Sequence, residues 1–129
     1  MSALWEIQVG LFAVLSAGLT IPVYERVPKA AALPYLNIGE ENFSPDDHKT
    51  GEGETLSLVL HFWGDAGARK EITMQMKAVK ALLHRKPAAV NVAGFSLWDL
   101  HLGASDLMRD VDDKLIHGVM RFHFSVELL

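Results

Sequence analysis

Histidine is the residue type that most clearly offers chemistry in this chain, which has six histidines and no cysteine. Imidazole nitrogens bind zinc and act as general acids or bases. His61, His117 and His123 alternate with the apolar residues of two predicted strands, and His101 could lie near them on a third. His117 and His123 are about 20 Å apart along one strand, too far for two ligands of one ion. We interpret these histidines as polar sheet residues, and we predict no metal and no cofactor.

The other motifs with possible chemistry are incomplete. Asp110, Asp112 and Asp113 resemble part of a calcium loop, but the glycine and the distal glutamate of an EF-hand are missing, so we predict an acidic turn. The chain has no glycine-rich phosphate loop, no Gly-x-Ser-x-Gly motif and no cysteine nucleophile. Its net charge is -4, and its most basic segment lacks aromatic residues, which argues against sequence-specific nucleic-acid binding. These observations indicate a protein that is not an enzyme.

Charge is distributed unevenly along the chain. Residues 40–54 contain six acids and one lysine, whereas residues 69–86 contain six bases and one glutamate. Two ordinary solvated faces would explain this pattern. Alternatively, the acidic loop of one subunit meets the basic helix of the next, a head-to-tail contact that closes into a ring if the rotation is suitable. The candidate contact residues are Asp46, Asp47, Glu52 and Glu54 on the acidic side, and Arg69, Lys70, Lys77 and Lys80 on the basic side.

The elements that position these residues begin with a helix. An apolar stripe predicts a helix over residues 3–17, with Ser2 as a possible N-cap and Gly18 as a left-handed cap. Pro28 and Pro34 then exclude a helix from the following stretch. Residues 23–26 could pair briefly at a sheet edge, and residues 34–43 predict a first long strand.

The rest of the chain alternates between a sheet and a second helix. Residues 44–53 are polar or small, which predicts either a slack, mobile connection or a binding loop. Residues 54–63 alternate as a strand, and Ile72, Met76, Val79 and Leu83 form the apolar stripe of a helix that ends before Pro87. Further strands are predicted from about residue 92 to 109, with a bulge at Gly103, and over residues 116–128.

This order predicts an α+β fold: an about four-stranded, mainly antiparallel sheet with two helices packed on one face. With 129 residues, the chain is expected to form a single domain, residues 1–129. An apolar content of 50% and a mean hydropathy of +0.16 are high for a small protein and favour oligomerisation. We find no secretory signal and no membrane-spanning segment, so we expect assembly in a cytoplasm.

A resemblance to a known family extends this interpretation. The chain resembles the tail terminator, or tail-completion, proteins of long-tailed, siphovirus-like phages and of gene transfer agents. The resemblance includes the helix at residues 4–15, V-Y-x-x-V-P at 23–28, P-Y-x-x-I-G-E at 34–40, the strand at 56–63 that leads into a helix, Arg109-Asp110 before an acidic turn, and residues 117–122. Asp113 departs from the pattern where a turn glycine is expected, which leaves the turn type open.

The resemblance implies a structural virion protein at the junction of tail and neck. Such a protein forms a hexameric ring that caps the tail tube, ends its polymerisation and joins the tail to the head. The implied partners are other copies of the chain, the tail tube protein, and the stopper or adaptor protein of the neck, while DNA passes through the lumen without being read. Two alternatives stay open: another neck ring protein, or a small α+β ligand-binding domain or enzyme that uses His61, His101 and His117.

Overall fold

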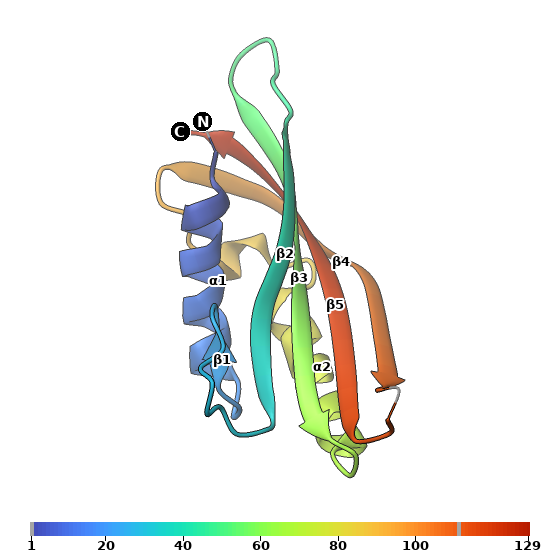
Figure 1. The fold of residues 1–129 in the computed structure, drawn as a ribbon. Helices are drawn as coiled ribbons and strands as arrows, with labels where there is room; N and C mark the ends of the chain where they lie inside the picture. Colours follow the sequence, from blue (N-terminus) through green and yellow to red (C-terminus); the bar gives the residue numbers. More distant parts are fainter. Residues whose placement is uncertain (1, 111) are drawn as a thin grey trace.

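The computed structural model describes residues 2–110 and 112–129. Within these ranges the chain forms α1 (Leu4–Gly18), β1 (Val23–Tyr24), β2 (Tyr35–Pro45), β3 (Gly53–Asp65), α2 (Arg69–Leu83), the short 3-10 helix η1 (Pro87–Ala89), β4 (Phe95–Arg109) and β5 (Leu115–Leu128), as shown in Figure 1. The predicted α+β class and the predicted order of the long elements are confirmed.

The described residues form a sheet of five strands in the order β1-β2-β3-β5-β4. The pairs β2–β3, β3–β5 and β4–β5 are antiparallel. In contrast, β1 runs parallel to β2 through Val23 and Tyr24. The sheet is therefore mixed, which is compatible with the predicted about four-stranded, mainly antiparallel sheet and adds one short parallel strand to it. The added strand confirms the expectation that residues 23–26 pair briefly at a sheet edge, although only Val23 and Tyr24 do so.

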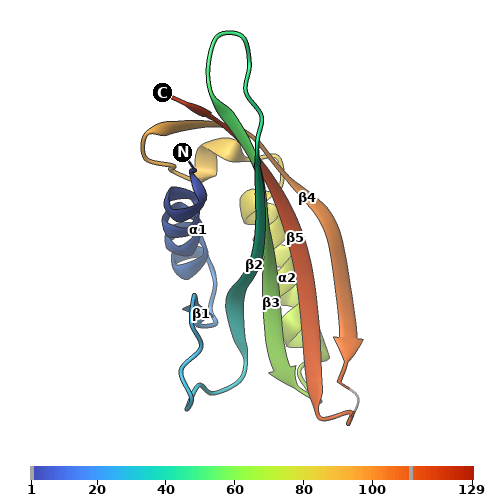
Figure 2. The ribbon, with the colours of Figure 1, turned by 45° about the horizontal axis from the view of Figure 1, so that its top comes forward.

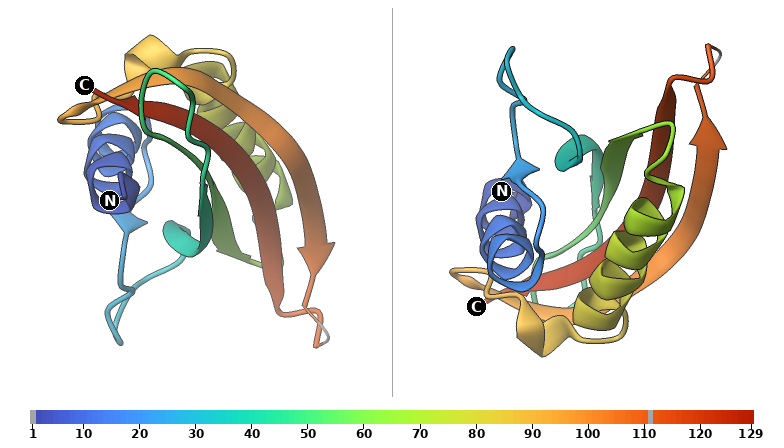
Figure 3. Two further views of the ribbon diagram at one scale, coloured as in Figure 1. Left: turned by 90° about the horizontal axis from the view of Figure 1, so that it is seen from above. Right: turned by 90° about the horizontal axis from the view of Figure 1, so that it is seen from below.

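Both helices pack against one face of the sheet. The side chains of Leu58, Leu60 and Phe62 in β3 point to that face, as do Met120 and Phe122 in β5, and all are buried. In Figure 1, α1 lies beside the β1–β2 side and α2 lies behind β3 and β5, and Figures 2 and 3 show the same arrangement from other directions. No helix of the described residues covers the opposite face of the sheet.

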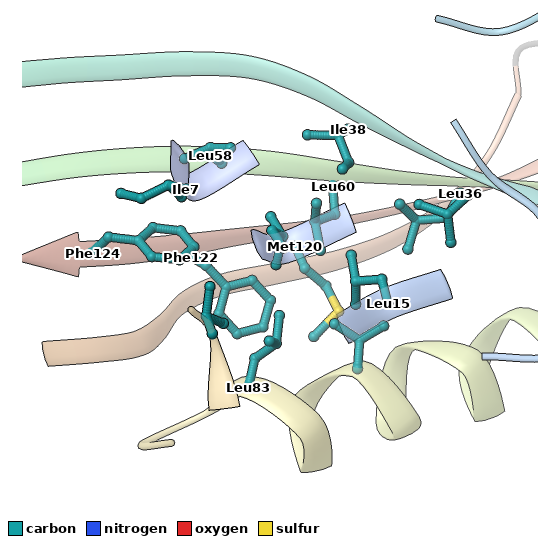
Figure 4. Packing of buried hydrophobic residues seen from close by; sticks show 14 of the residues in the cluster. Ile7, Leu15, Leu36, Ile38, Leu58, Leu60, Leu83, Met120, Phe122 and Phe124 are labelled. Carbon is teal, nitrogen blue, oxygen red and sulfur yellow. The ribbon is translucent and has the colours of Figure 1, made fainter. Parts of the chain in front are cut away.

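One hydrophobic cluster joins the two helices to the sheet. Figure 4 shows Ile7 and Leu15 of α1 and Leu83 of α2 meeting side chains of the sheet such as Phe122. All four of these residues are fully buried. Each buried side chain of this size contributes about 1.5–3 kcal/mol relative to its exposed state. The cluster thereby fixes the position of both helices.

The ends of α1 differ from those predicted. Ala3, rather than Ser2, occupies the N-cap position. At the other end, Gly18 is the last helical residue, and the chain continues through Leu19 in an extended conformation, so the predicted left-handed glycine cap is wrong. A glycine is nevertheless needed inside the helix at Gly10, since a Cβ there would overlap the carbonyl oxygen of Asn91.

The β2–β3 connection is more regular than the predicted slack loop. The nitrogen of Asp46 donates to the carbonyl of Gly53 (2.9 Å), and that of His48 donates to the carbonyl of Gly51 (2.8 Å), so the ladder continues almost to the tip. Backbone hydrogen bonds do not depend on the polarity of the side chains, so composition alone did not reveal this order. The alternative, a binding loop, stays a prediction. The result is a long hairpin that projects beyond the rest of the sheet (Figure 1).

The structure answers two predictions that concern glycine, the bulge at Gly103 and the turn type at Asp113. The predicted bulge at Gly103 is confirmed by a register shift between Leu102 and Ala104 in β4. In the β4–β5 turn, Asp113 adopts a positive φ of 56°, the left-handed conformation that glycine favours, and its nitrogen donates to the carbonyl of Asp110 (2.9 Å). The turn therefore tolerates aspartate in a glycine-like position; Val111, within the same predicted acidic turn, lies outside the described residues.

Candidate assembly surfaces

Three of the four predicted acidic residues lie at the tip of the β2–β3 hairpin, which we call the acidic tip (Asp46, Asp47 and Glu52). Asp47 and Glu52 are exposed and Asp46 is half-buried. One oxygen of Asp47 also accepts a hydrogen bond from the nitrogen of Gly53 (3.2 Å), which helps to close the hairpin. The hairpin therefore carries negative charge to the end of the molecule.

Glu54 lies outside this group. It is only 6% exposed, and its Oε1 accepts hydrogen bonds from the nitrogen of Ala3 (2.8 Å) and the hydroxyl of Ser2 (3.1 Å). A carboxylate at the start of a helix satisfies a free backbone N–H and interacts favourably with the helix dipole. Glu54 thus fixes the start of α1 to the base of the hairpin, and its charge is used within the subunit.

The four predicted basic residues, Arg69, Lys70, Lys77 and Lys80, are all exposed on α2. They occupy the outer side of this helix because Ile72, Val79 and Leu83 face the core. We call this surface the basic helix face.

The fold does not bring the acidic tip and the basic helix face together within one subunit. The start of α2 follows the opposite end of β3, a strand of 13 residues that spans about 40 Å. Among residues 2–110 and 112–129, the ion pairs are His48–Glu127, His61–Glu40, His101–Asp99 and Arg109–Asp113, and none of them uses these residues. Both charged surfaces are therefore open to a partner.

Four histidines gather on the sheet face that the helices leave open, as the alternation predicted. The first pair is His61 and His117, whose Nδ1 and Nε2 atoms are 2.7 Å apart. His61 Nε2 lies 2.8 Å from a carboxylate oxygen of Glu40, and the ring of His117 stacks on Trp63 with a centroid distance of 3.8 Å. A hydrogen bond between two imidazoles requires one to accept, so this network holds at least one neutral ring.

The second pair is His101 and His123, whose rings stack at 5.1 Å. His101 Nδ1 lies 2.8 Å from a carboxylate oxygen of Asp99. The ring of His123 occupies the space that a Cβ at Gly103 would fill, and the ring of His61 lies over Gly39 in the same way. The histidines thus pack over bulge glycines of neighbouring strands, which is a structural use of the open face.

The surroundings of these histidines and of Glu40 shift pKa values. Burial lowers the pKa of His117, and the neighbouring His61 lowers it further. Burial, followed by His101 and Arg121, likewise lowers the pKa of His123. The hydrogen bond from His61 lowers the pKa of the Glu40 carboxyl. Within residues 2–110 and 112–129, no group of three histidine or acidic side chains is placed to hold a metal ion.

Sequence reasoning missed an exposed apolar surface on α1. Trp5, Val9 and Phe12 are 61%, 50% and 43% exposed and form one stripe because they are spaced by four and three residues. We call them the α1 ridge. A signal for it was present, since residues 7–24 contain no charged side chain and Val9 and Phe12 lie outside the inward stripe.

Separate acidic, basic and apolar surfaces on a small α+β subunit define a structural protein that assembles with other chains. The family comparison agrees: residues 10–127 match the family described as "Tail completion protein gp17". The chain belongs to this family, whose members are structural proteins of phage tails and not enzymes. No helix among the described residues has the length and apolar composition needed to cross a membrane.

Two similar proteins show how far the likeness extends. The "Tail completion protein gp17" of Bacillus phage SPP1 is 25% identical over 104 residues, which cover 81% of this chain and 75% of that protein. A chain in the solved structure "Virion of native gene transfer agent (GTA) particle" is similar with a TM-score of 0.75 and 22% identity, over 98% of this chain and 92% of that one. At this identity the second likeness shows a shared fold.

Proposed function

We propose that this protein forms a hexameric ring that caps the tail tube, ends its polymerisation and joins the tail to the neck of the head. Family membership supports the role in completing a tail. The observation that carries the ring is the separation of the acidic tip from the basic helix face. A subunit with opposite charges on two distant surfaces cannot satisfy them internally, but a head-to-tail neighbour can.

The proposed contacts place Asp46, Asp47 and Glu52 of one subunit against Arg69, Lys70, Lys77 or Lys80 of the next. We leave Glu54 out of this set because its carboxylate is buried at the start of α1. Contacts between surface charges give orientation and specificity more than affinity. Apolar contacts must therefore supply much of the stability of the ring.

The proposed mechanism is geometric. One side of the ring matches the last ring of tube subunits, and its other side offers no surface to which another tube subunit can add. That second side binds the stopper or adaptor protein of the neck, and DNA passes through the lumen without sequence-specific contacts.

Growth of tail tubes in vitro tests this function. The tail tube protein of the same particle is allowed to polymerise with and without the purified chain, and tube lengths are measured by electron microscopy. We expect shorter tubes with an extra ring of density at one end. Tubes of unchanged length with no bound ring would contradict termination, and binding without any change in length would favour another neck protein.

A further inference from the structure

The α1 ridge is exposed, although the opposite side of α1 is in the core. Trp5, Val9 and Phe12 lie beside a shallow cavity of about 190 Å³, which Gln8, Glu25 and Ile38 complete. Soluble proteins rarely leave a helix apolar on all sides, and large exposed aromatic side chains are typical of contact surfaces. The ridge thus requires an apolar partner.

The ridge is continuous with the acidic tip. Both lie on the side of the sheet formed by β1 and β2, and the contact between Glu54 and Ala3 joins the start of α1 to the base of the hairpin. On the same side, the outer edge of β2 pairs with β1 only at Leu36 and Asn37. One lateral side of the subunit therefore combines negative charge, an apolar ridge and a free strand edge.

The opposite lateral side of the sheet has the complementary features. Its edge strand β4 pairs on one side only, with β5, and exposes 52% of Trp98. The C-terminal end of α2 is close to Trp98, because the residues after the helix bind β4 next to it: the nitrogen of Arg85 donates to the carbonyl of Leu100 (2.9 Å). This side thus combines an exposed tryptophan, the exposed Arg85 and a strand edge that, among the described residues, has no further strand beside it.

The exposed tryptophan on one side and the start of the α1 ridge on the other lie at the same level along the strands. Leu97 and Asp99, which flank Trp98, pair with Val126 and Ser125 of β5. These two residues pair in turn with Glu54 and Thr55 of β3. Since Glu54 contacts the start of α1, Trp98 and the N-terminal part of the ridge lie at one level on opposite sides of the sheet. Such a subunit can contact an identical neighbour at the same height.

We propose that the α1 ridge of one subunit receives the part of β4 around Trp98 of a second copy of this chain. This inference rests on the proposed ring, and it adds the apolar half of the subunit contact. The matching level supports the choice of a second copy, since each subunit carries the ridge and Trp98 at the same height on opposite sides of the sheet.

Cysteine cross-linking tests the proposal directly, because the natural chain has no cysteine. Val9→Cys in the ridge is combined with Ser96→Cys in β4, two residues from Trp98; both positions are exposed, and both tryptophans are kept. A short bismaleimide is added to the purified chain and to complete particles. We expect a ladder of covalent oligomers larger than dimers from the double variant, and from neither single variant.

The control pairs Val9→Cys with Met108→Cys, an exposed position about 40 Å further along β4 than Ser96. This pair should give no ladder. Dimers from Val9→Cys alone, cross-links from Val9→Cys to a different virion protein, or particles that contain the double variant without a ladder would each overturn the proposal. If tails keep their normal length, these results contradict the contact between subunits and leave the proposed function unaffected. Conversely, a chain that forms the ladder but does not stop tube growth would contradict only the termination role.

Discussion

At the scale of single residues, Glu54 differs from its acidic neighbours, because its carboxylate has a structural role and theirs lie at the surface. Glu54 and Glu52 are two residues apart and belong to the same acidic run, but one is buried against α1 and the other is exposed. Sequence reasoning grouped them because the partner of Glu54, the nitrogen of Ala3, is 51 positions away in the chain. Charge patterns locate acids along the sequence; only the fold decides which of them reach solvent.

We therefore predict different effects of two matched substitutions. Glu54→Gln removes the charge that interacts with the N–H of Ala3 and should lower the free energy of unfolding by about 1–3 kcal/mol. Glu52→Gln should change it by less than about 0.5 kcal/mol, as expected for an exposed side chain. Chemical denaturation of both variants measures the difference. Equal stability of the two variants would show that Glu54 is not a cap.

The histidine network predicts a dependence of stability on pH. Because the pKa of His117 and of His123 is lowered in the folded protein, the unfolded chain binds more protons as the pH falls through 6.5. His84, whose pKa is lowered by burial and by Arg85, acts in the same direction. The free energy of unfolding should therefore be at its full value above about pH 6.5. It should decrease as the pH falls from there toward the lower pKa values that these histidines have in the folded protein.

His117→Phe tests the share of one histidine. The substitution keeps a ring on Trp63 and removes one titrating group, so we expect a shallower loss of stability between about pH 7.5 and 5.5. The contribution linked to the lowered pKa of Glu40 is present above its unfolded value of 4.5 and is lost at lower pH, outside this window. An unchanged slope in the variant would contradict the assignment, whatever the absolute stability.

At the scale of secondary structure, the elements with a clear period were predictable. The alternation in β3 and β5 and the apolar stripe of α2 gave the sheet face and the packed helix correctly. The brief pairing expected for residues 23–26 at the sheet edge is confirmed for Val23 and Tyr24. The regular hairpin tip was missed, because backbone pairing holds it without a side-chain pattern. The α1 ridge was missed because the inward stripe already explained the helix.

The packing of α1 predicts a change in stability opposite to the one that helix propensity predicts. Replacing glycine with alanine inside a helix normally stabilises by about 1 kcal/mol. Gly10→Ala should instead destabilise, because the new Cβ would overlap the carbonyl of Asn91 and force α1 away from the segment after η1. Ser16→Ala, on an exposed side of α1, is the control that should show no such loss. Thermal melting compares the two, and a higher melting temperature for Gly10→Ala would contradict the close packing.

At the scale of the whole molecule, the order of its motifs pointed to the right family before any contact was known. Those motifs lie on several elements, at β1, the start of β2, the end of β4 and the start of β5. The motifs did not show which surfaces meet in an assembly, because this depends on which distant segments lie on the same side of the fold. The acidic tip and the start of α2 lie far apart because the 13 residues of β3 separate them.

Charge reversal tests the contact between subunits. Lys77→Glu with Lys80→Glu should impair ring formation by at least several-fold and leave the subunit folded, because both side chains are exposed. Mixing this variant with a second one that carries Asp47→Lys and Glu52→Lys should restore association between the two. Sizing of the complexes and circular dichroism provide the measurements. Assembly of the first variant at the level of the natural chain would remove the acidic tip and the basic helix face from the contact.

The central claim is that this protein ends the growth of the tail tube, and the length of tails made without it is the most direct measurement. Particles are produced with the gene deleted and are examined by electron microscopy beside particles with the gene restored. We predict tails that are longer than normal and detached from filled heads, with normal lengths after restoration. Tails of normal length in the absence of the protein would contradict the claim.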